Sequence, residues 1–320
     1  MLFRRMLALL IGASLALSAQ AETPRVVATI KPLQLIAAAV LDGIDQPAVL
    51  LPPGASPHTY ALRPSERRAV AQAERIYWVG PEMEMFLAQL LAERGVAVAM
   101  MNAPGLETRT LSQSLNFQAT AAEHDHDHKH SHKHTHDHKH GDHHHAPGSL
   151  DAHIWLSPTN AVAMARLMAT DLVDLYPAHQ DQLAENFERF EARIEALDAD
   201  LAARLTPLQG KPYFVFHDAY GYFEDRYGLG ARGVFSLSHE VQPGARHVNL
   251  LRQQLSDAGP SCVFSEPQFT PRLVDSLTQG LPVQRAELDP LATDHAPSAT
   301  ASENALRDLG ERLAGCLEQL

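Results

Sequence analysis

A run of histidines between residues 124 and 145 is the most conspicuous chemical feature of this sequence. It reads HDHDHKHSHKHTHDHKHGDHHH, so that imidazole recurs at almost every second position. Neutral imidazole is a good ligand for borderline transition metals, and we therefore expect the run to bind metal ions. Its histidines are His124, His126, His128, His130, His132, His134, His136, His138, His140, His143, His144 and His145.

The same run is a poor candidate for the main metal site. Its Asp, Lys and Gly residues leave no apolar face to bury, which predicts a mobile loop with many weak, interchangeable sites. A tight site needs ligands held in fixed geometry by a surrounding shell of hydrogen bonds. An affinity tag would have a similar composition, but tags lie at chain termini and are usually uninterrupted. We therefore interpret residues 121–147 as an auxiliary metal-binding loop.

Four further candidate ligands are far apart in the sequence and lie at or just past the ends of predicted strands. Separations of 64 to 95 residues exclude a local zinc finger or ribbon, whose ligands come in close pairs. Ligands of α/β folds bind at the carboxyl ends of the strands, so these residues can still converge in space. Three nitrogens and one carboxylate would suit tetrahedral zinc. The four candidates are His58, His153, His217 and Asp289.

Position alone does not decide the role of a histidine. A single histidine beside an apolar strand is more often held by hydrogen bonds in the packing than bound to metal, so the sequence supports both interpretations of His58, His153 and His217 equally. The remaining histidines have no such position. We interpret them as structural or surface residues, and they are His179, His239, His247 and His295.

The N-terminus has the organisation of a secretory signal peptide. Arg4 and Arg5 precede an apolar run over residues 6–17, and Ala19-Gln20-Ala21 supplies the small residues of a cleavage site near Ala21. The run is too short to cross a bilayer, and no later segment approaches the roughly twenty apolar residues that a membrane helix needs. No cysteine near the cleavage site can carry a lipid. We therefore expect a soluble mature protein in the periplasm.

The mature chain is strongly acidic. Loss of residues 1–21 removes two of the 26 basic residues and leaves 24 against 38 acidic residues, a net charge of −14 with neutral histidine. This charge argues against nucleic acid or an anionic membrane as a partner and favours a metal cation.

Cys262 and Cys316 are the two cysteines of the chain. In an oxidising compartment such a pair is more often a disulfide than a metal site, so we predict a structural bridge. It would close a loop of about 55 residues and stabilise the fold by at most roughly 4 kcal/mol in the chain-entropy model.

Strands alternate with helices in both halves of the mature chain, which predicts an α/β fold of two lobes, each with a parallel sheet flanked by helices. In the first half, strands are predicted at residues 25–30, 47–51, 76–79 and 96–101, and helices at 33–44, 65–74 and 82–94. A polar insert over 102–149 interrupts the pattern, which resumes at 153–156 before a helix that ends at Pro177. In the second half, strands are predicted at 213–216, 233–237, 262–265 and 282–288, and helices at 220–227, 246–258, 271–279 and 303–317.

Residues 179–205 predict one long helix, because they are rich in Ala, Leu, Glu and Arg and contain no Gly or Pro. About 27 helical residues span roughly 40 Å, enough to bridge two lobes, although an ordinary packed helix remains the alternative. The predicted division is a signal peptide at 1–21, a first lobe at 22–178, a linker helix at 179–207 and a second lobe at 208–320.

Six strings of the sequence resemble the periplasmic zinc-binding proteins of ABC uptake systems, in the same order and with a histidine-rich insert between the first two. The resemblance covers essentially the whole mature chain and implies two α/β lobes joined by one rigid long helix. The strings are GASPHTYALRPS, HIWLSP, YFVFHDAYGYF, EVQPGA, CVFSEPQF and LDPLA.

The resemblance also implies a ligand set. The family's ligand histidines match His58, His153 and His217, and its disulfide matches the two cysteines. Manganese-binding relatives have an aspartate at the position of Asp289, whereas water or another carboxylate can complete the shell in zinc members. Pro57 stands where some zinc members have an acidic residue, which removes one candidate. Manganese-binding members have glutamate in place of His217, because a hard ion prefers oxygen donors, so this chain is expected to prefer zinc.

The function implied by the resemblance is zinc capture and delivery to a membrane ABC permease with its ATPase subunit, by a monomer that catalyses nothing. The sequence has no P-loop, so ATP hydrolysis must belong to the partner. A secreted zinc hydrolase is an alternative, but there is no H-E-x-x-H, no nucleophile elbow and no obvious general base near the ligands. A periplasmic zinc buffer or chaperone that works through the histidine-rich loop is the second alternative.

Overall fold

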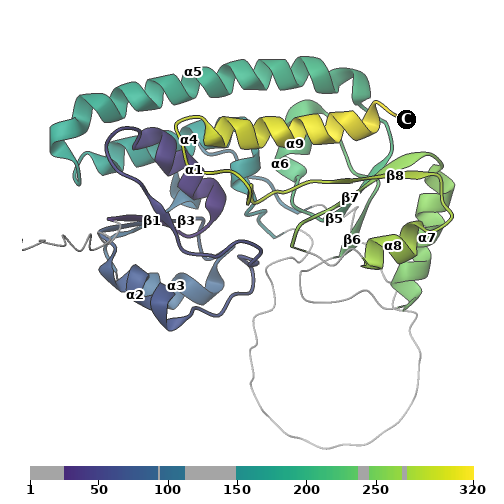
Figure 1. Cartoon of the computed structure of the whole chain (residues 1–320), viewed down its shortest axis with the longest axis horizontal. Coiled ribbons are helices and arrows are strands. Elements are labelled where there is room, and N and C mark those ends of the chain that lie inside the picture. Colours follow the sequence, from purple (N-terminus) through teal and green to yellow (C-terminus); the bar gives the residue numbers. More distant parts are fainter. Residues whose placement is uncertain (1–24, 93, 112–148, 237–244, 269–271) are drawn as a thin grey trace, which may run out of the picture.

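The computed structural model describes residues 25–92, 94–111, 149–236, 245–268 and 272–320 (Figure 1). The predicted signal peptide, the histidine-rich run and His239 lie outside the described residues, so the predictions for them stay untested. Two four-stranded parallel sheets form the framework of the chain. The α/β fold class with two lobes is therefore confirmed.

The first sheet has the order β2-β1-β3-β4, with every pair parallel. Apart from Arg75, its central strands are apolar and buried on both faces, as expected for parallel strands covered by helices. The strands are β1 Val26–Ala28, β2 Ala48–Val49, β3 Arg75–Trp78 and β4 Ala97–Ala99. The helices of this lobe are α1 Lys31–Val40, α2 Pro64–Gln72, α3 Met85–Ala92 and α4 Pro158–Leu172.

The second sheet has the order β6-β5-β7-β8 and is also fully parallel, so the second lobe repeats the topology of the first. Its strands are β5 Tyr213–His217, β6 Gly233–Ser236, β7 Ser261–Ser265 and β8 Val283–Glu287. Its helices are α6 Gly221–Tyr227, α7 Ala245–Ala258, α8 Arg272–Thr278 and α9 Ala301–Leu317.

The predicted long helix is confirmed as α5, Gln180–Leu205, which runs along both lobes with α9 beside it (Figure 1). Its buried side chains, all apolar except Asn186, recur mostly every three or four residues and form one stripe. The stripe packs against α1 and α4 of the first lobe and against α6 and α9 of the second. The buried positions are Leu183, Asn186, Phe187, Phe190, Ile194, Leu197, Leu201 and Leu205.

One apolar core continues from the first sheet across α5 to the second lobe, so the lobes share buried residues. The predicted disulfide is confirmed: Cys262 of β7 is bonded to Cys316 of α9, with an S–S distance of 2.03 Å. The bridge attaches the terminal helix to the second sheet. Within the part of the chain that is described, no helix has the length and apolar character needed to cross a membrane.

The structure corrects one predicted element near the candidate ligands. The stretch 153–156 does not continue the strand pattern, because Ile154–Leu156 forms a 3₁₀ helix that leads into α4. The hydroxyl of Ser157 caps α4 by accepting a hydrogen bond from the backbone N–H of Asn160 at 3.2 Å. His153 is therefore placed by a tight turn and a capped helix, and the expectation that it follows a strand was wrong.

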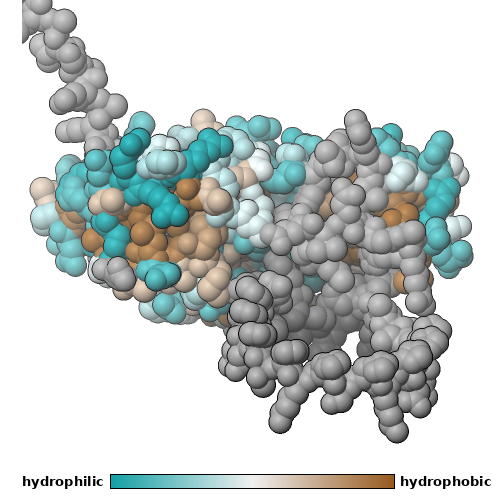
Figure 2. All heavy atoms as spheres, turned by 90° about the horizontal axis from the view of Figure 1, so that it is seen from below, coloured by the Kyte–Doolittle hydropathy of each residue, from teal (hydrophilic) through white to brown (hydrophobic). Residues whose placement is uncertain are grey.

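Apolar side chains gather on the underside of the first lobe, where α2 and α3 lie (Figure 2). Met85, at the start of α3, keeps 49% of its surface exposed. Next to it, the ring of Phe86 meets the ring of Tyr60 edge to face, with centroids 6.1 Å apart. Tyr60 also donates a hydrogen bond to Glu66 of α2 at 2.8 Å. These two contacts anchor the segment between β2 and α2, which carries His58.

Candidate metal centre

Three imidazoles from distant parts of the chain meet between the two lobes. One ring nitrogen from each of His58, His153 and His217 lies within 4.8 Å of the others. Among the described residues no other group of three or more His, Cys, Asp or Glu is arranged to hold a metal ion. His153 and His217 are only 2% and 5% exposed, whereas His58 is half-buried. The group is therefore closed on one side and reachable from the other.

Each of the three histidines comes from a different kind of element. His217 is the last residue of β5, a central and fully buried strand, as the sequence predicts. His58 lies in the anchored segment between β2 and α2. His153 precedes the 3₁₀ helix, where Trp155 donates a hydrogen bond from its indole N–H to the carbonyl of Pro290 in the second lobe, at 2.7 Å. That bond ties the ligand-bearing turn of one lobe to the other.

Two buried carboxylates orient two of the rings. Nδ1 of His153 lies 2.8 Å from Oδ1 of Asp151, and Nδ1 of His217 lies 2.6 Å from Oε1 of Glu266. A carboxylate beside Nδ1 favours the tautomer with the proton on that nitrogen, which leaves the lone pair on Nε2 for a metal. The Nε2 atoms of His153 and His217 do face each other, 3.4 Å apart.

This separation matches zinc. Two nitrogens bound to one tetrahedral ion at about 2.0–2.1 Å are about 3.3 Å apart. The observed 3.4 Å between the two Nε2 atoms is close to that value. The two rings are therefore already spaced as a chelate, and His58 supplies a third nitrogen to the same place.

Burial sets the protonation of the site. It lowers the pKa of His217 well below the ordinary value, because the charged ring would lose its hydration. The ring is therefore neutral at neutral pH and can donate a lone pair. Burial raises the pKa of Glu266 well above its ordinary value, so its charged form is costly without a neighbouring cation. Burial also disfavours the charge on Asp151, but hydrogen bonds from His153 and Arg109 outweigh it and lower the pKa of Asp151.

Asp289, predicted as the fourth ligand, does not belong to this group. Its carboxylate accepts hydrogen bonds instead. Oδ1 accepts from the side chain of Gln268 at 3.1 Å and from the backbone N–H of Leu291 at 3.0 Å, and Oδ2 accepts from the backbone N–H of Thr293 at 2.6 Å and from its hydroxyl. In this conformation Asp289 holds the turn after β8, beside Pro290 and Leu291, which border the metal cavity.

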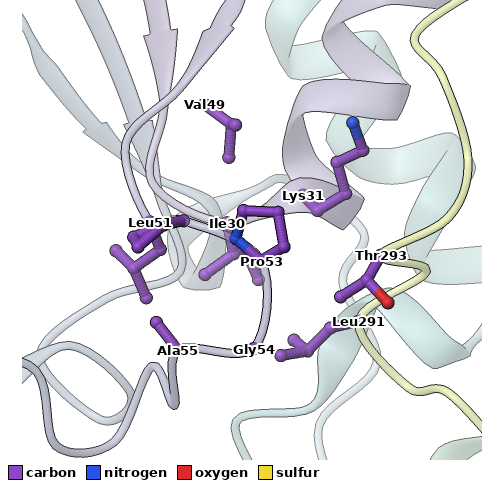
Figure 3. A pocket seen from close by; sticks show the side chains of 10 residues that line it. Ile30, Lys31, Val49, Leu51, Pro53, Gly54, Ala55, Leu291 and Thr293 are labelled. Atoms are coloured by element: carbon purple, nitrogen blue, oxygen red, sulfur yellow. The ribbon is translucent and has the colours of Figure 1, made fainter. Parts of the chain in front are cut away.

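A neighbouring pocket lies between the segment after β2 and the turn after β8, where Thr293 and Leu291 face Pro53 and Gly54 (Figure 3). Its lining is mostly apolar and includes Lys31, whose pKa is lowered by burial. It contains no set of metal donors.

Two of the histidines interpreted as structural or surface residues fit that interpretation. His179 is exposed and lies 3.2 Å from the side-chain oxygen of Gln182, and Nε2 of His295 lies 3.2 Å from Asp308. His239 lies outside the described residues, as does the side chain of His247.

The carboxylates behind the ligands were not predicted from the sequence. Asp151 precedes His153 by two residues in the string DAHIWLSP, and Glu266 lies in CVFSEPQF, so both were adjacent to recognised motifs. A metal-bound histidine usually donates its second N–H to a carboxylate or carbonyl. An acidic residue near a candidate histidine in the sequence is therefore a signal for such a partner, although the sequence does not show which acid the fold brings close.

Comparison with known proteins identifies the family. The chain matches the family described as "Zinc-uptake complex component A periplasmic" over residues 26–311. It is 39% identical to the high-affinity zinc uptake system protein ZnuA of Yersinia pestis, over 92% of this chain and 91% of that protein. It is 37% identical to the protein of the same name from Brucella suis, over 96% and 95%. A crystal structure of a ZnuA has the same fold, with a TM-score of 0.71 and 24% identity over 91% of this chain and 98% of that one. The chain belongs to the ZnuA family, the periplasmic component A of zinc-uptake complexes.

Proposed function

We propose that this chain captures zinc with high affinity in the periplasm and delivers it to an ABC permease for uptake. The observation that carries the proposal is the convergence of three imidazole nitrogens within 4.8 Å, two of them already at the separation of a tetrahedral chelate. The relatives named above are zinc uptake proteins, which supports the same ion. The family is a non-enzymatic transport component, and zinc is cargo that leaves unchanged.

The donor set favours zinc over manganese and magnesium. Neutral imidazole suits zinc, copper and nickel, whereas manganese and magnesium prefer oxygen. Asp151 and Glu266 raise the basicity of the rings that they touch, and the charge of a bound cation would offset the cost of the buried carboxylate of Glu266. A bound zinc ion would therefore be stabilised both by the imidazole nitrogens and by the carboxylates behind two of the rings.

The fourth position is proposed for water or for Asp289. In the described conformation, Asp289 would have to exchange its hydrogen bonds to Thr293 for the metal. Water needs no such exchange, because half-buried His58 leaves the site reachable from one side. An open fourth position also suits a protein that must release its ion to a partner.

The partner is proposed to be a membrane permease with a separate ATPase subunit, since the sequence contains no P-loop. The chain is proposed to act as a monomer after removal of the signal peptide near Ala21. The run of twelve histidines favours one other function, a periplasmic zinc buffer or chaperone that works through the loop. The two functions differ in which site holds zinc tightly.

The test uses a full-length mature chain in which the twelve loop histidines are replaced by glutamine, called the loop-Gln chain below. This change keeps the length of the insert while removing its donors. In the loop-Gln chain, His58→Ala, His153→Ala and His217→Ala should each weaken zinc binding strongly in competition with a chelator of known affinity. His179→Ala, at an exposed position just before α5, is the matched control and should bind as the parent does. Loss of tight binding in the loop-Gln parent itself would favour the buffer instead.

A further inference from the structure

Arg109 connects the His153 side of the metal centre, in the first lobe, to helix α6 of the second lobe. Its Nη1 donates a hydrogen bond to Oδ2 of Asp151 at 2.6 Å, and its Nε donates to Oδ2 of Asp225 at 2.8 Å. The Arg109 side chain is 17% exposed and that of Asp151 is fully buried. One guanidinium therefore bridges a carboxylate that touches the ligand His153 and a carboxylate on the other lobe.

The backbone of Arg109 is also hydrogen-bonded to α6 and to Asp151. The backbone N–H of Arg109 donates to the hydroxyl of Tyr222 at 3.2 Å, and that hydroxyl donates to the carbonyl of Asp151 at 2.9 Å. The backbone N–H of Asp151 donates in turn to the carbonyl of Arg109 at 2.9 Å. The strand-like pair formed by residues 109–111 and 149–151 is thus attached to α6 by side chain and main chain together.

The start of α6 is shaped to receive the guanidinium. A Cβ atom added to Gly221 would lie 1.6 Å from Nη1 and 2.1 Å from Cζ of Arg109, so that no side chain fits there while Arg109 keeps its position. The guanidinium carbon also lies 5.8 Å from the ring centre of Tyr222. Gly221 and Tyr222 therefore hold the guanidinium of Arg109 against α6 by contacts that are separate from its ion pairs.

The two carboxylate oxygens of Asp151 contact different residues. Oδ1 meets Nδ1 of His153 and also accepts the backbone N–H of His153 at 3.0 Å, while Oδ2 meets Arg109. Because a carboxylate is planar and rigid, fixing Oδ2 fixes the direction of Oδ1. The orientation of the His153 ring depends in this way on where Arg109 is held.

We propose that Arg109 is a positioning residue of the metal centre. It orients the ring of His153 through Asp151, and it fixes the position of that ring relative to the second lobe through its contacts with Asp225 and Gly221. The proposal rests on the proposed zinc site. It predicts that a substitution that disturbs the contacts of Arg109 with α6, while leaving every ligand in place, weakens zinc binding. Removing a partner behind a metal-bound histidine typically costs about 10- to 100-fold in affinity, and we expect a loss in that range for Arg109→Met.

Gly221→Ala provides the second variant. It keeps Arg109 but displaces its guanidinium, so it should reproduce the loss seen with Arg109→Met. The double variant should be no weaker than the stronger single variant, because both changes break one connection. Asp225→Asn weakens only the contact to the second lobe at a largely exposed residue, so it remains folded and should show a smaller loss.

Two matched controls separate positioning from stability. Arg193 of α5 makes a comparable ion pair with Glu303 at 2.5 Å and donates to the carbonyl of Ala299, away from the metal centre. Arg193→Met should lower the free energy of unfolding but leave zinc affinity unchanged. Gly315→Ala adds a Cβ that meets no atom within 4 Å and should change neither property.

All variants are made in the loop-Gln chain, with zinc affinity measured by chelator competition and folding checked by circular dichroism and urea unfolding. Weaker affinity for Arg109→Met and Gly221→Ala, without additivity and with both controls unchanged in affinity, supports the proposal. Parental affinity in folded Arg109→Met or Gly221→Ala overturns it, as does an equal loss with Arg193→Met. If Arg109→Met fails to fold, the zinc affinities of Gly221→Ala and Asp225→Asn test the proposal: weaker binding supports it, and parental binding in both overturns it. A parent that binds no zinc tightly refutes the proposed function instead.

Discussion

Nδ1 of His217 and Oε1 of Glu266 lie 2.6 Å apart, and both side chains are almost completely buried. His217 ends a strand at the centre of the second sheet, and Glu266 follows the neighbouring strand β7. Parallel strands bring their carboxyl ends to the same edge, so a ligand and its supporting carboxylate come from adjacent strands. The second sheet thus supplies both the donor His217 and the side chain that orients it.

Substitution of Glu266 should separate its charge from its hydrogen bond. In Glu266→Gln the amide oxygen can still accept the proton of His217 Nδ1, so the ring stays oriented while the charge is lost. Glu266→Ala removes both. We expect zinc affinity in the loop-Gln chain to fall moderately with Gln and by about 10- to 100-fold with Ala, measured by chelator competition. Glu224→Gln, at a buried glutamate that binds Tyr213, is the control and should leave affinity unchanged. Parental affinity for Glu266→Ala would remove Glu266 from the site.

Replacing Asp289 tests the fourth position. Because its carboxylate already accepts four hydrogen bonds around the turn after β8, we expect Asp289→Asn to lower the free energy of unfolding. Its zinc affinity should stay within about threefold of the parent, less than the tenfold that corresponds to about 1.4 kcal/mol. That result would leave the fourth position to water. A loss of tenfold or more, with the folded fraction unchanged, would instead place Asp289 in the shell.

Exchange of His217 for glutamate should change which metal is preferred. His217→Glu replaces a borderline nitrogen donor with a hard oxygen donor, so the ratio of zinc to manganese affinity should fall in competition titrations. The new carboxylate would stand beside Glu266, and two buried like charges are costly. His217→Glu with Glu266→Gln should therefore bind manganese better than His217→Glu alone. An unchanged ratio in both variants would place selectivity in the packing of the lobes.

A buried carboxyl away from the metal centre gives the fold its own pH dependence. Glu84 accepts a hydrogen bond from the hydroxyl of Thr29 and another from the backbone N–H of Gly80 at 3.1 Å, and burial raises its pKa to about 7. The folded protein therefore binds this proton more tightly than the unfolded chain does. Stability from this group is highest below the unfolded pKa and is lost as the pH rises through about 7.

Glu84→Gln should remove that dependence. We expect the free energy of unfolding of the variant, relative to that of the parent, to rise by about 2 kcal/mol between about pH 5 and about pH 8, since one unit of pKa shift corresponds to about 1.4 kcal/mol. Urea unfolding at both pH values measures this difference. Glu311→Gln, at an exposed position of α9, is the control and should show no such gain. An equal pH response in parent and Glu84→Gln would contradict the assignment.

The sequence predicts the parts of this protein that depend on local pattern. The strand before His217, the long helix and the disulfide follow from periodicity, composition and compartment, and the structure confirms them. His153 was predicted both from an expected strand and from the string around it, but the strand is absent, because Ile154–Leu156 forms a 3₁₀ helix. Periodicity could not show this, because a three-residue turn has no repeat to detect.

The residues behind the ligands depend on distant contacts and were not predictable in the same way. Glu266 reaches His217 across 49 residues, and Arg109 reaches Asp225 across 116. No local pattern links such pairs, because their proximity is created by the pairing of strands and the docking of α6. Asp289 shows the converse: its place after β8 was predicted correctly, yet its carboxylate is turned into its own loop.

The histidine-rich loop should form a second, weaker class of zinc sites. Each site there would use few donors on a chain that loses conformational entropy on binding, whereas the three lobe histidines are already held in place. Exposed imidazoles gain protons near pH 6.5 and lose the lone pairs that bind metal. The weak class should therefore disappear as the pH falls through that region. The lobe site should hold zinc to lower pH, because protonation must compete there with the whole chelate.

Calorimetric zinc titrations at about pH 7.5 and about pH 5.5, on either side of the histidine pKa, can separate the two classes. The unmodified mature chain should show several weak sites and one tight site at the higher pH, and only the tight site at the lower pH. The loop-Gln chain should show only the tight site at both, since it keeps every residue of the lobes. A single class with the same stoichiometry in both chains would show that the twelve histidines do not bind zinc under these conditions, and the loop would then need a role unrelated to metal.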